Sequence, residues 1–193
     1  MNIELENKLR ELVSHGQLDQ AISIAEEELS QHVKTDFHKV IGINLLHLVD
    51  ELNAYIEYFY TTLASKTTIK AMYAEMNGFT INYDLWFISL FAFEKYEDLE
   101  DKDWLGDYDV MYDHYFSISG FEELQAAYEN YMKNEDWEDE ENEAVADICE
   151  LIIILRLQEL FKAAKEAALK KGLSWGNIPL FVTAHDSELL CKV

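Results

Sequence analysis

Apolar residues recur every three or four positions through most of the first 66 residues, which predicts amphipathic helices. The segments 3–15 and 17–31 both show this spacing. Gly16 between them is a candidate C-cap, so the chain is expected to begin with an antiparallel helix pair. A third, long helix is predicted from the candidate N-cap Asp36 to about Leu63. Its apolar stripe comprises Ile41, Leu45, Leu48, Leu52, Tyr55, Phe59 and Leu63.

The pattern changes to that of β-strands after residue 66. The segment 67–76 is rich in β-branched and aromatic residues, and the Asn77–Gly78 pair that follows is typical of a tight hairpin. The segment 85–96 is apolar on both faces, which indicates a central strand covered on two sides. Further strands are expected near 108–118 and at 178–185.

Helices return at 120–132 and 143–172, and an acidic loop is expected between them. This order of elements predicts the α+β class: N-terminal helices followed by a small antiparallel β-sheet of about three to five strands, packed against long helices. A chain of 193 residues fits a single domain of this kind. Its helical part is expected at 1–66, and the sheet with further helices at 67–193.

Composition limits the classes of function. The formal net charge of −23 disfavours direct contact with nucleic acid or with an anionic membrane, because both need Lys and Arg, and it permits a basic protein partner. The N-terminus has no signal-peptide pattern, no apolar run reaches the length of a membrane span, and the two cysteines form no disulfide framework. We therefore expect a cytoplasmic protein without a membrane segment, and the sequence leaves its oligomeric state open.

The acidic residues are concentrated in one part of the chain. Residues 94–143 contain 19 Asp and Glu against three Lys, a balance of −16 out of −23. There, "DLEDKDWLGDYDVMYDH" (98–114) sets seven carboxylates among large aromatics, and Trp137 stands in a second acidic segment. Three interpretations compete: a metal or acid–base site, a docking face for a basic partner, and a solvated loop beside the core. An aromatic anchor ringed by carboxylates that steer Lys and Arg suits a docking face. The candidate partner-binding residues are Asp101, Asp103, Trp104, Asp107, Asp109, Trp137, Asp139 and Glu140.

The chain has no P-loop, no dinucleotide fingerprint, no nucleophile elbow, no HExxH and no CxxC pair, so we assign it no cofactor, metal ligand or catalytic residue. The first alternative is a carboxylate- and metal-dependent enzyme, with candidate ligands Asp107, Asp109, Asp113 and His114. The second is a helical scaffold or oligomer built on the N-terminal helix pair. His185 and Asp186 follow the last predicted strand, where an ordinary polar chain end is favoured over a catalytic pair.

The stretch "IKAMYAEMNGFTINYDLWFISLFAFEKYEDLEDKDWLGDYD", followed by "FSISGFEELQAAYENY", resembles small acidic bacterial proteins over roughly residues 67–132. In style it is also similar to immunity proteins of bacterial toxin–immunity pairs. The resemblance implies a protein that neutralises a cognate toxin, commonly a basic nuclease, by occupying its nucleic-acid-binding surface; it transfers no functional residue. The favoured interpretation is a non-enzymatic cytosolic binding protein, of inhibitor or immunity type, with an acidic–aromatic docking face.

Overall fold

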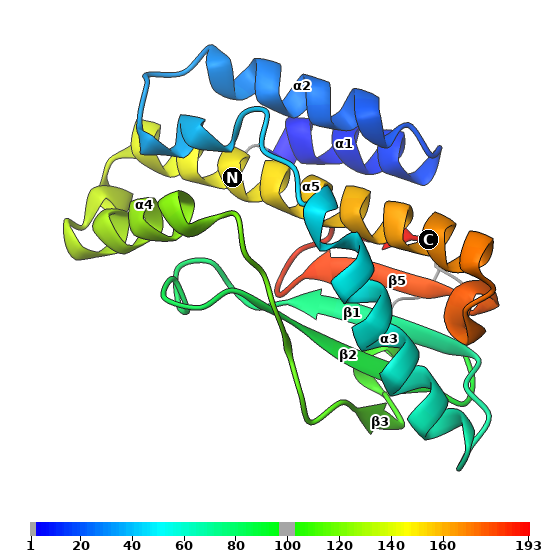
Figure 1. The fold of residues 1–193 in the computed structure, drawn as a ribbon. Helices are drawn as coiled ribbons and strands as arrows, with labels where there is room; N and C mark the ends of the chain where they lie inside the picture. Colours follow the sequence, from blue (N-terminus) through cyan, green and yellow to red (C-terminus); the bar gives the residue numbers. More distant parts are fainter. Residues whose placement is uncertain (1–2, 97–102) are drawn as a thin grey trace.

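The computed structural model describes residues 3–96 and 103–193, which form a layer of helices over a mixed β-sheet (Figure 1). The α-helices are α1 (Ile3–Ser14), α2 (Leu18–Ser30), α3 (Val49–Ala64), α4 (Glu122–Lys133) and α5 (Glu140–Lys171). The strands are β1 (Ala71–Met76), β2 (Phe87–Phe93), β3 (Val110–Met111), β4 (Phe116–Ser117), β5 (Leu180–Ala184) and β6 (Cys191–Lys192). Short 3-10 helices are η1 (Asp36–Val40), η2 (Leu46–Leu48), η3 (Asp103–Gly106), η4 (Asp136–Glu138) and η5 (Ser174–Asn177).

The sheet differs from the prediction in both direction and strand number. Its order is β3-β2-β1-β5-β6, with β4 also paired to β2, so the described chain contains six strands. β1 is antiparallel to β2 but parallel to β5, with Met72 opposite Leu180 and Met76 opposite Ala184. A wholly antiparallel sheet is therefore wrong. The cause is α5, which carries the chain back along the sheet as the long connection that a parallel neighbour requires.

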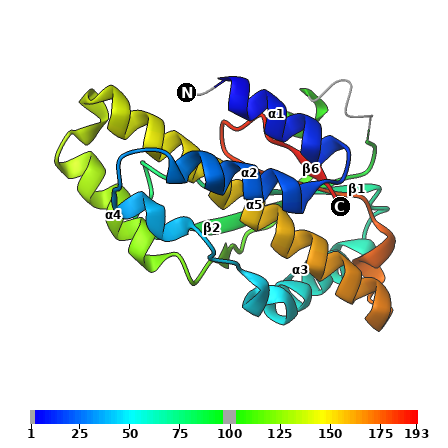
Figure 2. The same ribbon diagram turned by 90° about the horizontal axis from the view of Figure 1, so that it is seen from above.

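The predicted N-terminal helix pair is confirmed as α1 and α2. Seen from above, α1, α2 and α5 lie side by side over the strands (Figure 2). Leu9, Ala25 and Leu29 of the pair are fully buried in the main core, whereas Ile3 at the start of α1 is 66% exposed. The apolar faces of α1 and α2, on which the scaffold alternative depended, thus pack mainly against other parts of the same chain.

The long helix predicted over 36–63 is wrong in its first half, where the chain forms η1 and η2 and α3 begins only at Val49. Gly42 interrupts the helix because it takes a φ of +79°, in the left-handed region. Its N–H donates to Glu26 Oε1 at 2.9 Å, which ties this loop to α2. The apolar spacing was preserved across the break, so periodicity alone did not reveal it.

The structure also differs from two predictions about the strands, the hairpin at Asn77–Gly78 and the single strand near 108–118. Asn77–Gly78 does not form a two-residue hairpin, since β1 and β2 are joined by the longer loop 77–86. Asn77 closes that loop with its side chain: Nδ2 donates to Leu85 O at 2.9 Å, and Oδ1 accepts the Phe87 N–H at 2.8 Å. The strand expected near 108–118 is divided into β3 and β4, which pair with different parts of β2.

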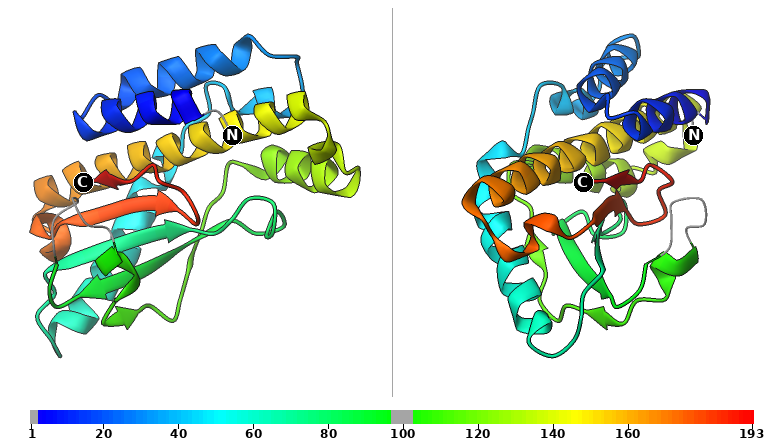
Figure 3. Two further views of the ribbon diagram at one scale, coloured as in Figure 1. Left: turned by 180° about the vertical axis from the view of Figure 1, so that it is seen from behind. Right: turned by 90° about the vertical axis from the view of Figure 1, so that its right-hand side faces the viewer.

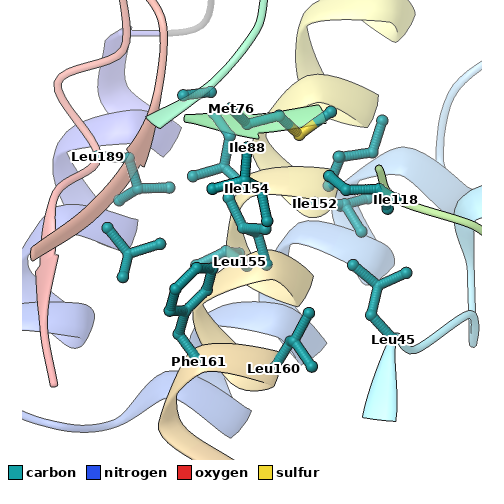
Figure 4. Close-up of a cluster of buried hydrophobic side chains, with 14 of the residues drawn as sticks. Leu45, Met76, Ile88, Ile118, Ile152, Ile154, Leu155, Leu160, Phe161 and Leu189 are labelled. Carbon is teal, nitrogen blue, oxygen red and sulfur yellow. The ribbon is translucent and has the colours of Figure 1, made fainter. Parts of the chain in front are cut away.

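Helix α5 forms the centre of the hydrophobic core (Figure 4). It begins at Asp139, whose Oδ1 accepts the Glu141 and Asn142 N–H groups, both at 3.0 Å, and it ends at Gly172, whose φ is +66°. Figure 4 shows Ile154, Leu155 and Phe161 of α5 among side chains from the strands and loops. None of the helices in the described ranges has the length and apolar content needed to cross a membrane.

Candidate functional site

Alternation along the strands gives the sheet an inner face toward the helices and an outer face away from them. The outer face carries a second, smaller apolar cluster, which includes Tyr73, Phe91, Phe93 and Phe181. In the right-hand view of Figure 3 the helices lie on one side of the strands and η3 lies on the other. The outer face is therefore where the segment from 103 onward meets the sheet.

Trp104 is the anchor of this segment. Its ring centroid lies 4.8 Å from that of Phe93 and 5.3 Å from that of Phe181, both in edge-on geometry, and the side chain is half-buried. Edge-on aromatic pairs of this kind stabilise a fold beyond the area that they bury. Trp104 thus belongs to the fold, and Asp103 and Asp107 on either side of it are exposed.

Beyond Trp104, large apolar side chains remain exposed on the same side of the sheet. Tyr108 packs at 4.8 Å on Phe91 yet is 44% exposed, and Tyr115 packs at 4.8 Å on Phe87 yet is 55% exposed. Met111, opposite Phe91 in the register, is 50% exposed. We call these three side chains, together with Asp107, Asp109 and Asp113, the edge surface.

The three carboxylates of the edge surface have different roles. Asp109 Oδ2 accepts the Glu94 N–H at 2.7 Å, so this side chain fixes the approach to β3. Asp107 and Asp113 are exposed, and Asp113 Oδ1 lies 3.7 Å from Nε2 of His114, an imidazole that is charged only when protonated. In the described ranges neither of these two carboxylates forms an ion pair with Lys or Arg. Both are available to a cation from another molecule.

A groove of about 310 Å³ continues the edge surface between α3 and β3. Its walls include Tyr58, Lys66, Met111, Tyr112 and His114. Tyr58 is 64% exposed, and the Tyr55 hydroxyl beneath donates to His114 O at 2.7 Å. The groove therefore joins an exposed ring on α3 to the exposed side chains of the edge surface.

The remaining predicted residues lie elsewhere. Asp101 falls outside the described residues, and Asp103 is exposed in η3. Trp137, Asp139 and Glu140 lie at the corner between α4 and α5, at the opposite end of the molecule from β3 (Figures 1 and 3). The residues of this predicted face that the structure describes therefore occupy two separate regions.

At the α4–α5 corner the acids have a structural explanation. The expected acidic loop is short, because Asp139 caps α5 and Glu140, Glu141 and Glu143 fill its first turn. Carboxylates at a helix N-terminus are stabilised by the helix dipole and by the free N–H groups. Trp137 in η4 remains 47% exposed.

The metal alternative finds no support in the geometry. Among the residues that the structure describes, no group of three or more His, Cys, Asp or Glu side chains is positioned to hold a metal ion. Asp107, Asp109, Asp113 and His114 in particular do not converge, since Asp109 turns to the backbone of Glu94.

His185 and Asp186 lie just after β5. His185 Nδ1 is 3.1 Å from Glu75 Oε1, and the Tyr73 hydroxyl donates to the other oxygen of Glu75 at 2.7 Å. In the described part of the chain no hydrogen bond joins His185 to Ser187 or Cys191, and burial raises the pKa of the Cys191 thiol to about 11. These residues therefore do not form a nucleophile–base pair.

Sequence reasoning missed two acidic residues of α5, Asp147 and Glu150, which line a pocket beside His185. The available signal was two carboxylates three positions apart at the start of an otherwise apolar run, "DICELIIIL".

Comparison with models of known protein families, with curated proteins and with solved structures finds no match to this chain.

Proposed function

We propose that this protein binds a basic protein partner through the edge surface. The observation that carries the proposal is the presence of Tyr108, Met111 and Tyr115, each about half exposed, beside the carboxylates of Asp107 and Asp113. Single exposed apolar residues are ordinary, but several together with a charged rim are typical of an interaction site.

The two kinds of side chain would have separate roles in binding. Aromatic and Met side chains are enriched at interface centres, and a central aromatic anchor commonly contributes about 2 kcal/mol or more. Exposed carboxylates contribute less affinity but raise the association rate with a cationic partner and orient it. The net charge of −23 extends this steering over the whole molecule.

The kind of partner follows from the resemblance to immunity proteins. A protein of that type would neutralise a basic toxin by covering the surface with which the toxin binds nucleic acid. Carboxylates spaced along a surface present charge to Lys and Arg much as phosphates do, which is compatible with this role. The proposal is therefore a non-enzymatic inhibitor of a basic protein.

The test uses a double variant, Asp107→Asn with Asp113→Asn. A basic protein captured from lysate is purified, and its affinity for wild type and variant is measured at low and high salt. We expect the variant to bind about tenfold more weakly at ~50 mM salt and nearly normally at ~500 mM salt, where the Debye length is short.

The matched control is Asp19→Asn with Glu27→Gln on α2, which changes the net charge equally on exposed positions far from β3. If the control loses as much affinity as the test variant, overall charge and not the edge surface governs binding. An unchanged affinity in the test variant removes the edge surface from the proposal.

A further inference from the structure

The edge of the sheet at β3 presents backbone groups that none of the described strands uses. β3 is the last strand of the order β3-β2-β1-β5-β6, and its register places Met111 opposite Phe91. The Tyr112 N–H donates to Leu90 O at 2.8 Å, so Tyr112 directs its backbone groups toward β2. Because these directions alternate along an antiparallel strand, the N–H and C=O of Met111 point away from the sheet.

An open edge of this kind is a template for another extended chain. A strand placed beside β3 would exchange backbone hydrogen bonds with Met111, and extended segments of binding partners dock on sheet edges in this way. The Met111 side chain is 50% exposed, so solvent reaches this part of the edge. The edge of β3 therefore offers a partner backbone contacts in addition to the side chains of the edge surface.

The groove between α3 and β3 lies beside this edge and suits apolar side chains. It measures about 310 Å³, and its walls include Phe59, Leu63 and Met111. Lys66 and Asp113 also line it, and their opposite charges leave the groove without a strong preference for a charged group. Since the side chains of a strand point alternately to the two faces of a sheet, every second residue of an added strand would enter this groove.

The remaining side chains of an added strand would lie over the outer face, beside a carboxylate and an exposed ring. Tyr108 is 44% exposed, and the neighbouring Asp107 is exposed and has no Lys or Arg partner in the described ranges. A basic side chain can lay its apolar stem and its charge on such a ring and reach the carboxylate. Pairing of two copies of this chain at the edge is opposed by the net charge of −23.

We propose that the edge of β3 binds an extended segment of the basic partner by strand addition. Basic and apolar residues alternate in this segment: the apolar side chains enter the groove, and the basic side chains lie beside Asp107 and Tyr108. This inference rests on the proposed function, because it specifies how the same edge surface holds its partner.

The experiment titrates the full chain with a short blocked peptide in which arginine and valine alternate, and follows hydrogen exchange of the Met111 amide. The peptide is expected to slow this exchange by about tenfold or more. It should also bind at least about tenfold more tightly than the same peptide N-methylated at every amide, because methylation removes the hydrogen-bond donors and keeps the charge. A peptide that alternates glutamate and valine should bind at least about tenfold more weakly than the arginine peptide.

Two variants separate the backbone of Met111 from its side chain. Met111→Pro removes the outward N–H and should reduce peptide affinity about tenfold; the preceding Val110 is in an extended strand, as proline requires. Met111→Ala keeps the N–H and should lose less affinity. If Met111→Pro does not fold, the two arginine peptides still test the wild-type protein.

Three results would overturn the proposal. The first is equal binding of the methylated and unmethylated arginine peptides, and the second is unchanged exchange of the Met111 amide when peptide binds. The third is protection of that amide at rising protein concentration without peptide, which would assign the edge to a second copy of the chain.

Failure of this inference can be told from failure of the proposed function. Suppose that the purified basic partner is weakened by Asp107→Asn with Asp113→Asn but binds Met111→Pro as it binds wild type. Strand addition is then wrong and the proposed function stands. If instead the arginine peptide binds as expected and the double variant keeps full affinity for the partner, the proposed function fails and the edge still binds basic extended segments.

Discussion

Asp103–Trp104 and Asp136–Trp137 are the same dipeptide in similar acidic surroundings, and each forms part of a 3-10 helix, yet the two tryptophans end in opposite environments. Trp104 packs edge-on against Phe93 and Phe181 on the outer face of the sheet. Trp137 projects from the α4–α5 corner with 47% of its surface exposed. The difference lies in what each segment meets: a sheet face on which none of the described α-helices packs, or a corner already closed by helices.

The acids around the two tryptophans differ in the same way. Beside Trp137, Asp139 caps α5 and the glutamates that follow occupy its first turn, so the local helix accounts for them. Beside Trp104, the Asp107 side chain caps no helix in the described ranges and lies beside exposed rings. Similar acidic composition thus reflects helix capping in one region and exposed carboxylates beside exposed rings in the other.

The largest expected effect concerns the two tryptophans. Trp104→Ala removes the ring that covers the outer cluster and should lower the free energy of unfolding by about 2–4 kcal/mol, measured by urea denaturation. Trp137→Ala should lower it by less than about 1 kcal/mol, because about half of this side chain is already exposed to water and it belongs to no buried cluster among the described residues. Equal losses of unfolding free energy in the two variants would contradict the difference in packing between Trp104 and Trp137.

A second prediction contrasts acids in solvent with the acid in the pocket. The pKa of Glu150 is raised in the folded state to about 8 from about 4.5, so the protonated form stabilises the fold at low pH, and this contribution is lost as the pH rises from about 4.5 to 8. Glu150→Gln should match wild type near pH 4 and exceed its stability at pH 9 by on the order of 2 kcal/mol.

Thermal or urea unfolding of both proteins across this pH range measures the difference. Glu166→Gln, on the exposed side of α5, serves as the control, and its stability should depend on pH as that of wild type does. A Glu150→Gln curve parallel to wild type would show that Glu150 is solvated in the folded protein.

The smallest effect separates capping acids from the acids of the edge surface. Asp139→Ala removes the acceptor for two N–H groups at the start of α5 and should cost about 1 kcal/mol. Asp107→Ala should change stability by no more than about 0.5 kcal/mol. If both variants lose the same stability, the carboxylate of Asp107 is structural and its assignment to a binding surface fails.

Local sequence signals predicted the helices well where the chain makes its own contacts. The pair α1 and α2 and the end of α5 at Gly172 follow from apolar spacing and capping residues. Helix α5 begins at Glu140, before the predicted start at 143, because Asp139 caps it. The long helix over 36–63 failed because a glycine at positive φ interrupts it without disturbing the apolar spacing. The Asn77–Gly78 hairpin failed because the Asn77 side chain closes a wider loop.

By itself the sequence determined the class of the fold, the N-terminal helix pair, the end of α5 and the accumulation of acid in the middle of the chain, because helix spacing, caps and charge are local properties. Only the tertiary structure decided that β5 lies parallel to β1, that Trp104 is covered and Trp137 is not, and that Glu150 faces a pocket. These features depend on which distant surfaces meet: α5 returns the chain so that β5 runs beside β1, and the pocket lies where these two strands end against α5.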